Sequence, residues 1–143
     1  MGYKFNAKHA TESVITFIKN WFDENGKDCK AIIGISGGKD SSINAALCVK
    51  ALGKDRVIGI MMPNGNQHDI DVSKDLCEYL DIEHYIINIE GAYNSLLSEF
   101  KGQINSEINK NSEINLAPRL RMSTLYMVAQ TMNGRVICTG NLS

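Results

Sequence analysis

Apolar residues follow two patterns along this chain, one typical of buried strands and one typical of helices. Short apolar runs, bounded by glycine, proline or polar residues, predict strands over residues 31–35, 57–62, 83–89 and 135–139. The continuous run 31–35 suits a strand that is buried on both faces. Apolar positions that recur at steps of three and four predict helices; these cover residues 11–23, 41–52, 69–80, 91–100 and 116–132. The polar segment 101–113 is expected to be a loop or a weak helix.

The order of these elements predicts the fold class. Strands alternate with helices, which is typical of parallel crossovers in a doubly wound, mostly parallel α/β sheet with helices on both faces. We find no internal repeat and no linker, so residues 1–143 are expected to form one domain. In sheets of this kind, ligands bind outside the carboxyl ends of the strands.

Composition narrows the class of protein. The net charge is −1, so we expect no nucleic-acid partner. No apolar run approaches the roughly 20 residues of a membrane span, and the first nine residues lack the apolar core of a signal peptide. The four cysteines are scattered singly, which favours neither a zinc site nor disulfides and predicts a cytoplasmic protein. We expect Cys48 and Cys138 to be small buried hydrophobic residues.

A glycine-rich stretch, G-I-S-G-G-K-D-S-S at residues 34–42, follows the first predicted strand and opens the next helix. A helix N-terminus offers unpaired N–H groups and a positive dipole end, so this turn suits a phosphate group. The glycines allow the backbone to approach an anion closely. Hydroxyl groups of Ser36, Ser41 and Ser42 can add donors, and Asp40 could hold a Mg²⁺ ion that bridges phosphates.

This stretch differs from the commonest phosphate loops. Three residues rather than four separate Gly34 from Gly38, and Asp40 follows Lys39 where a Walker A motif has Ser or Thr. The stretch instead resembles the S-G-G-x-D-S signature of the PP-loop ATP pyrophosphatases, which cut ATP to AMP and pyrophosphate. In that family the loop cradles the pyrophosphate that is released. The alternative is an ordinary glycine turn between a strand and a helix.

A second constellation narrows the resemblance. Residues 115–122 read N-L-A-P-R-L-R-M, residues 125–126 read L-Y, and residues 139–143 read T-G-N-L-S. These segments resemble the N-x-x-A-R-x-R-M, L-Y and T-G-N-x-S-E region of the NAD synthetase family. Residues 62–69, M-P-N-G-N-Q-H-D, also resemble the segment that follows the second strand in that family. The resemblance therefore extends from about residue 31 to the last residue.

The resemblance implies an adenine nucleotide alpha hydrolase-like, Rossmann-like fold and ATP-dependent amidation of deamido-NAD⁺. The nicotinate carboxylate would attack the α-phosphorus of ATP, and pyrophosphate would leave. Ammonia would then convert the acyl-adenylate to NAD⁺ and AMP. Mg²⁺ would be required, and the family forms homodimers, with the 116–132 helix expected at the interface. Only residues 1–30 precede the first strand, which favours free ammonia over a preceding glutaminase domain.

The family's site residues can be transferred to matching positions of this sequence. The implied ATP site comprises Gly34, Ile35, Ser36, Gly37, Gly38, Lys39, Asp40, Ser41 and Thr139. Asp40 would also bind Mg²⁺, and Arg119 would contact deamido-NAD⁺. Arg121 matches the motif without an assigned contact. Without the resemblance, Thr139 could simply end a strand and Arg119 could be a solvated surface residue.

Two departures from the family pattern affect these expectations. Pro118 replaces the usual alanine, and we expect it in the first turn of its helix, where proline is tolerated. The family motif continues with a Mg²⁺-binding Glu, whereas this sequence ends at Ser143. The chain thus resembles an N-terminal portion of a NAD synthetase, and we expect weak or no turnover unless the missing C-terminal segment is added.

Two other hypotheses remain open. The chain could be another PP-loop enzyme, either an amidotransferase or a tRNA-modifying enzyme, although the balanced charge and scattered cysteines disfavour the latter. It could also be a non-catalytic module that binds MgATP without producing AMP.

Overall fold

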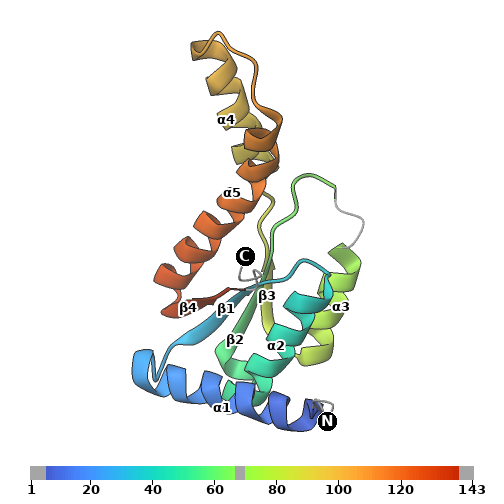
Figure 1. The fold of residues 1–143 in the computed structure, drawn as a ribbon, viewed down its shortest axis with the longest axis vertical. Coiled ribbons are helices and arrows are strands. Elements are labelled where there is room, and N and C mark those ends of the chain that lie inside the picture. Colours follow the sequence, from blue (N-terminus) through green and yellow to red (C-terminus); the bar gives the residue numbers. More distant parts are fainter. Residues whose placement is uncertain (1–5, 67–69, 139–143) are drawn as a thin grey trace, which may run out of the picture.

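The computed structural model describes residues 6–66 and 70–138, in which four parallel strands form a single sheet (Figure 1). The strands lie in the order β3-β2-β1-β4, with bounds β1 Lys30–Gly34, β2 Val57–Met61, β3 Glu83–Ile86 and β4 Gly134–Ile137. Every pairing is parallel, as in Ile32 with Ile58 and Ile32 with Val136. The predicted parallel α/β fold is confirmed.

Five α-helices connect and precede these strands. Their bounds are α1 Ala7–Asn25, α2 Lys39–Leu52, α3 Ile70–Leu80, α4 Glu90–Gln103 and α5 Lys110–Thr131. The first helix begins four residues before its expected start, because Asn6 caps it by accepting a hydrogen bond from the His9 N–H at 3.2 Å. No helix within the described ranges is both long enough and apolar enough to cross a membrane.

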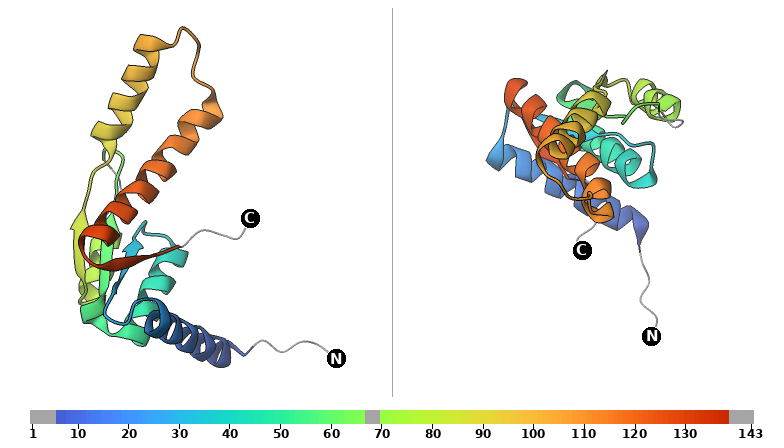
Figure 2. Two further views of the ribbon diagram at one scale, coloured as in Figure 1. Left: turned by 90° about the vertical axis from the view of Figure 1, so that its left-hand side faces the viewer. Right: turned by 90° about the horizontal axis from the view of Figure 1, so that it is seen from above.

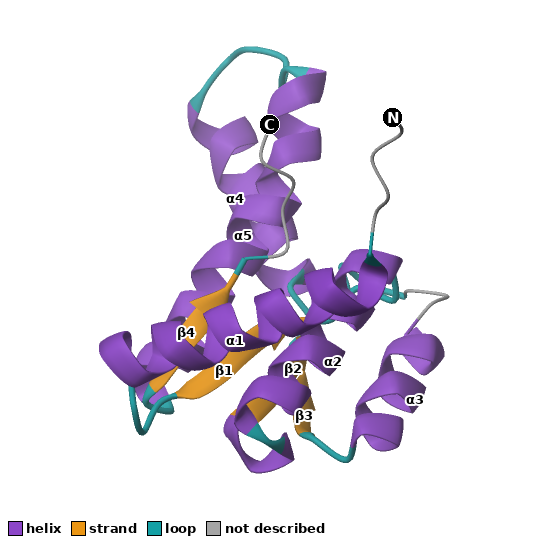
Figure 3. Cartoon of the chain, turned by 60° about the horizontal axis from the view of Figure 1, so that its bottom comes forward, coloured by secondary structure: helices purple, strands orange, loops and turns teal. Residues whose placement is uncertain are grey.

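The sheet separates two hydrophobic clusters, as the alternation of its central strand requires. Ala31 and Ile33 of β1 face one cluster, whereas Ile32 between them faces the other. The first cluster includes Phe22 of α1, with contributions from α2 and α3, and Leu125 of α5 belongs to the second. Figure 3 shows these helices around the sheet. Helices therefore cover both faces, and the prediction that β1 is buried on both sides is confirmed.

Two cysteines expected to be buried differ in the structure. Cys48 of α2 is fully buried in the first cluster, as predicted. Cys138 is exposed, contrary to expectation, because β4 ends at Ile137 and the next residue lies beyond the regular strand. An apolar residue at the end of a strand pattern therefore did not indicate burial here.

The helices α4 and α5 form a hairpin that extends away from the sheet (Figures 1 and 2). Asn109 caps α5 by accepting a hydrogen bond from the Asn111 N–H at 2.9 Å, so the helix begins six residues before its expected start at residue 116. Its first two turns project beyond the sheet and carry mostly exposed polar residues, which explains why no apolar periodicity marked them.

This earlier start changes the position of Pro118. The expectation that Pro118 lies in the first turn is wrong, because it lies inside α5. Proline has no N–H, so the Ile114 carbonyl lacks its usual helical donor at this point. Arg119 and Arg121 consequently lie in the helix interior and not near its N-terminus.

The strand order reverses between β1 and β4. From β1 the chain continues to β2 and then β3 on one side, and it returns through α5 to β4 on the other. A crevice at the carboxyl ends of the strands is expected at such a reversal. The glycine-rich turn leaves β1 at this position.

Candidate functional site

The glycine-rich turn joins the end of β1 at Gly34 to the start of α2 at Lys39. Gly37 has a φ of 84°, a conformation that side chains other than glycine rarely adopt. Gly38 caps α2 with an extended φ of −83°, so it does not require a glycine for its backbone angle. The first-turn N–H groups of a helix have no intrahelical acceptor, so the start of α2 faces the turn with donors. The predicted strand, glycine loop and helix N-terminus are therefore confirmed.

Serine hydroxyls hold the shape of this turn. Ser41 is 3% exposed, and its Oγ accepts a hydrogen bond from the Ser36 N–H at 3.3 Å. The same Oγ lies 3.2 Å from the Ser36 Oγ and donates to the Gly38 carbonyl at 3.2 Å. The Ser42 hydroxyl also donates to the Gly38 carbonyl, at 2.8 Å. The hydroxyls of Ser41 and Ser42, expected to be phosphate donors, thus brace the loop in this structure.

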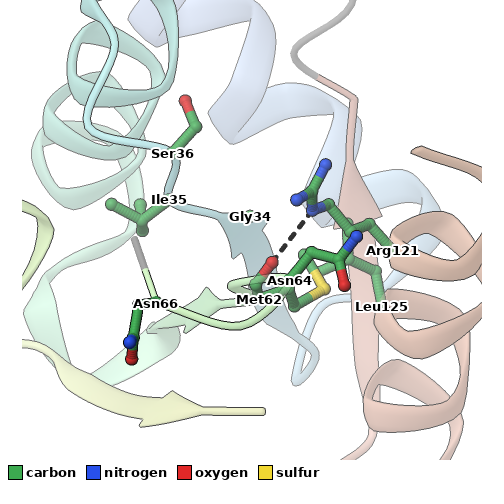
Figure 4. Close-up of a pocket in the computed structure, with 8 residues that line it drawn as sticks. All are labelled: Gly34, Ile35, Ser36, Met62, Asn64, Asn66, Arg121 and Leu125. Carbon is green, nitrogen blue, oxygen red and sulfur yellow. Dashed lines mark hydrogen bonds between the residues drawn. The ribbon is translucent and has the colours of Figure 1, made fainter. Parts of the chain in front are cut away.

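A pocket of about 390 Å³ lies beside the turn, at the carboxyl ends of the neighbouring strands β1 and β2. This volume falls within the range of small-ligand sites. The pocket is lined by Gly34, Ile35, Ser36, Met62, Asn64, Asn66, Arg121 and Leu125 (Figure 4). Its wall therefore combines the end of β1, the segment after β2 and one face of α5.

Close packing at the end of β1 shapes one side of this pocket. A Cβ atom on Gly34 would lie 3.2 Å from the Met62 Cε and 3.5 Å from the Leu125 Cδ1. A side chain at this position would therefore press against the residues that join the sheet to α5.

Arg121 is the cation of the pocket lining. It lies one helical turn before Leu125, which is buried in the core, so the same face of α5 directs both residues toward the sheet. The half-buried Arg121 donates from Nε to the Met62 carbonyl at 2.9 Å (Figure 4). Sequence reasoning found Arg121 through its motif but assigned it no contact, since the facing of α5 depends on tertiary packing.

The segment after β2 is held by the start of α4. The Asn88 side-chain oxygen accepts hydrogen bonds from the Gly65 N–H at 3.2 Å and from the Glu90 N–H at 2.9 Å. This link fixes the turn that carries Asn64 and Asn66 into the pocket. Neither asparagine was singled out from the sequence, although both lie in the segment 62–69 whose family resemblance was noted.

Of the other predicted ATP-site residues, those that the structure describes do not belong to the pocket lining. Lys39 and Asp40 are exposed in the first turn of α2. Thr139 lies outside the described residues. No group of three or more potential acidic, histidine or cysteine ligands occurs within residues 6–66 and 70–138, so Asp40 stands as a single carboxylate beside the loop. Mg²⁺ is often held by one carboxylate together with substrate phosphates, which such an arrangement fits.

Arg119 lies in a different place from the glycine loop. It is exposed and lines a groove of about 670 Å³ between α4 and α5. The apolar part of this groove consists of Leu96, Leu97, Phe100, Ile104, Ile108 and Leu116. The structure therefore separates the two arginines of the motif, with Arg121 in the pocket beside the loop and Arg119 in the hairpin groove.

Shifted pKa values occur away from the pocket. Burial raises the pKa of the Cys48 thiol to about 11, and burial together with the nearby charge of Glu78 raises the pKa of the Cys77 thiol to about 11. On the surface, Lys54 lies 2.6 Å from Asp81 and lowers the pKa of that carboxyl group through a hydrogen bond and charge attraction. These groups bear on stability and not on the chemistry of the pocket.

Comparison with known proteins gives consistent similarities. A family model described as NAD synthase matches residues 10–143. The NH₃-dependent NAD⁺ synthetase of Methanosarcina acetivorans is 38% identical over 135 residues, which cover 92% of this chain and 52% of that protein. The corresponding protein of Thermococcus kodakarensis is 35% identical over 134 residues, covering 94% of this chain and 51% of its own length. The chain thus spans about half the length of these curated relatives.

Solved structures with the same arrangement include an NH₃-dependent NAD synthetase from Campylobacter jejuni, with a TM-score of 0.85 and 29% identity over 96% of this chain and 58% of that one. A structure of an NMN synthetase from Francisella tularensis has a TM-score of 0.84 and 32% identity, covering 96% of this chain and 56% of that one. These similarities confirm the predicted fold class.

Proposed function

Because this chain belongs to the NAD synthase family, we propose that it contributes the ATP site of a ligase that amidates the nicotinate carboxylate of deamido-NAD⁺. The observation that carries this proposal is the pocket between the glycine loop and α5, at the carboxyl end of β1. A helix N-terminus, a glycine loop and a cation converge there, as the binding of a polyphosphate requires.

In this proposal, the glycine loop holds the phosphates of ATP. Backbone N–H groups of the loop and of the first turn of α2 donate to phosphate oxygens, while the Ser36 N–H stays bonded to the buried Ser41 hydroxyl, which keeps the loop in the required shape. Lys39, exposed at the start of α2, adds positive charge that screens the phosphates. Thr139 is proposed to contact ATP from beyond β4, as the family motif implies.

Asp40 is proposed to hold Mg²⁺ together with the ATP phosphates. Its exposed carboxylate in the first turn of α2 fits this role, because Mg²⁺ commonly keeps several waters and takes one or two protein carboxylates. The ion would neutralise charge on the phosphates and so favour the departure of pyrophosphate.

The proposed reaction has two steps. A carboxylate oxygen of deamido-NAD⁺ forms a bond to the α-phosphorus of ATP while the bond to pyrophosphate breaks, which gives an acyl-adenylate. Ammonia then forms the C–N bond and loses a proton, and AMP leaves with the electrons of the acyl C–O bond. The protein aligns the carboxylate with phosphorus and stabilises the departing charge, which are the usual contributions to phosphoryl and adenylyl transfer.

Arg119 is proposed to bind deamido-NAD⁺ from the groove between α4 and α5, in a homodimer whose interface includes α5. Exposed apolar side chains on α5 support this arrangement, including Met122, Tyr126 and Met127. A second copy of this chain would cover them and place the hairpin groove beside the interface. Light scattering after gel filtration should then give twice the monomer mass of 15.8 kDa.

A second candidate substrate follows from the Francisella relative. Because an NMN synthetase shares the fold at 32% identity, the acceptor could be nicotinate mononucleotide in place of the dinucleotide. The amidated carboxylate is the same in both cases, so the glycine loop and the pocket do not distinguish them. The choice between the two acceptors depends on the part of the site that binds the second nucleotide of the dinucleotide.

Other hypotheses from the sequence remain as outcomes of the test. Another PP-loop enzyme would bind ATP but neither nicotinate nucleotide, and so would a module that only binds MgATP. We also propose a cytoplasmic location, which the four free thiols support, since thiols persist in reducing compartments.

Titration calorimetry with Mg²⁺ and a non-hydrolysable ATP analogue tests the proposal. The wild-type chain should bind the analogue, and the complex should then bind deamido-NAD⁺ or nicotinate mononucleotide. Arg119→Ala should weaken nicotinate nucleotide binding by about 10-fold or more, because it removes charge-assisted hydrogen bonds. Lys110→Ala is the matched control, since it removes an exposed cation from the same helix. Equal affinities in all three chains, or no binding by the wild type, would contradict the proposal.

A further inference from the structure

The guanidinium group of Arg121 lies in the pocket that also contains Gly34 and Ser36 at the end of β1. α5 carries Arg121 to this place, and the buried Leu125 one turn later fixes the face of the helix that meets the sheet. Figure 4 shows the side chain reaching from α5 toward the strand end. The loop N–H groups and this arginine therefore approach one pocket from two different elements.

Arg121 is partly withdrawn from water without an opposite charge. Its Nε donates to the Met62 carbonyl at 2.9 Å, and no carboxylate in the described ranges, 6–66 and 70–138, forms an ion pair with it. A partly buried cation is costly unless an anion or several acceptors satisfy it. The backbone bond fixes the orientation of the side chain, and within residues 6–66 and 70–138 no carboxylate pairs with the charge of the guanidinium.

The chemistry of the guanidinium explains why this position favours arginine. Arginine has five N–H donors in a planar fork, so one donor can bond the Met62 carbonyl while others bind an oxyanion. A lysine ammonium is a single point charge on a flexible stem and does not reproduce this double role. The Met62 contact thus orients a group that can donate two hydrogen bonds to one anion.

We propose that Arg121 binds the α-phosphate of ATP, opposite the loop that holds the β- and γ-phosphates. This inference rests on the proposed function, and it adds a contact that neither the motif nor the family match assigned. The start of α2 carries Lys39 and Asp40 outside the pocket lining. Figure 4 shows Arg121 on the Gly34 side of the pocket, away from Ser36. A triphosphate that begins at the N-terminus of α2 and extends into the pocket therefore brings its last phosphate, the α-phosphate, to Arg121.

The same oxyanion chemistry could come from the nicotinate carboxylate, so the experiment separates the two sources. AMP, adenosine, magnesium pyrophosphate and, with the ATP analogue and Mg²⁺ present, deamido-NAD⁺ are titrated into the wild-type chain, Arg121→Ala and Arg121→Lys, with Lys110→Ala as the matched control. Arg121→Ala should weaken AMP binding by about 10- to 100-fold, since a charge-assisted hydrogen bond is lost. Adenosine and pyrophosphate should bind within about two-fold of wild type, and Arg121→Lys should fall between the other two chains for AMP.

Each alternative result overturns the inference. An unchanged AMP affinity in Arg121→Ala, or an equal loss for adenosine, would show that Arg121 does not bind the α-phosphate. A loss for deamido-NAD⁺ alone would assign the arginine to the carboxylate. Circular dichroism and urea unfolding check that the variants are folded. If Arg121→Ala does not fold, Arg121→Lys is used in its place. If the wild type binds the ATP analogue but the variant results fail, the proposed function stands without this contact; if the wild type binds no nucleotide, both fail.

Discussion

Replacing Ser41 with alanine should destabilise the protein, because the Ser41 hydroxyl is the buried brace of the glycine loop. The change removes the acceptor of the Ser36 N–H at 3.3 Å and the bond donated to the Gly38 carbonyl at 3.2 Å. The Gly38 carbonyl keeps the Ser42 hydroxyl at 2.8 Å and the Ser42 N–H at 3.3 Å, so its loss is small. The main cost is the loss of the two contacts with Ser36, through its N–H at 3.3 Å and its Oγ at 3.2 Å.

At about 0.5–1.5 kcal/mol for each hydrogen bond, the loss of these two costs about 1–3 kcal/mol. With a urea dependence of about 2 kcal/mol per molar, the midpoint of urea unfolding should fall by about 0.5–1.5 M. Ser42→Ala is the matched control for stability, since it removes a hydroxyl from the next residue without orphaning a donor. It should shift the midpoint by less than about 0.3 M, which corresponds to the roughly ±0.5 kcal/mol typical of mild substitutions.

The loop should also lose affinity for nucleotide when Ser41 is replaced. A loop that samples other conformations presents its N–H groups to phosphate only part of the time, so the affinity for the ATP analogue should fall together with the midpoint. If Ser41→Ala had the same midpoint of urea unfolding as the wild type and the same affinity for the ATP analogue, the proposed role of this hydroxyl would be refuted.

Two substitutions and two measurements on the buried thiols test separate features of the fold. Gly37→Ala should cost about 1–2 kcal/mol of unfolding free energy in urea titrations, because its φ of 84° disfavours a side chain. Pro118→Ala should raise the thermal midpoint, since it restores a helical donor inside α5 and proline costs up to about 3 kcal/mol there. A thiol reagent at pH 8 should label the exposed Cys138 quickly, but Cys48 and Cys77 only after unfolding. Burial raises the pKa values of both thiols from 9.0 to about 11. The stability that these thiols contribute is therefore complete below pH 9 and is lost as the pH rises through about 11. Urea unfolding at several pH values measures this loss.

The sequence predicted the sheet and the glycine loop because local signals agreed with tertiary structure there. The apolar run of β1 is buried on both faces, and its end coincides with a glycine turn and a helix start. Each of these features depends on a few neighbouring residues. A short apolar run, a glycine cluster and apolar positions at steps of three and four were therefore enough to indicate them. The parallel order of the strands followed from the alternation of strands and helices.

The start of α5 could not be predicted in the same way. Its first two turns extend beyond the sheet, where no apolar face is needed, and Asn109 sets the start through a single capping bond. Placing the helix start too late put Pro118 in the first turn, whereas it lies inside α5.

The separation of Arg119 and Arg121 also required the structure. Side chains two positions apart on a helix point in directions about 200° apart around its axis. Arg121 therefore faces the pocket, whereas Arg119 faces the groove between α4 and α5. The sequence motif joined them, but the packing of Leu125 against the sheet decides which of them reaches the loop. The assignments of Asp40 to Mg²⁺, of Thr139 to ATP and of Arg119 to deamido-NAD⁺ stay predictions.

The most direct test of ATP binding at the glycine loop is an NMR titration of ¹⁵N-labelled protein with a non-hydrolysable ATP analogue and Mg²⁺. The largest amide shift changes should occur at residues 36–41 and at the Arg121 side-chain Nε–H, with small changes along α4. Changes concentrated in the groove between α4 and α5, or no change at residues 36–41 at saturating analogue, would contradict an ATP site at the end of β1.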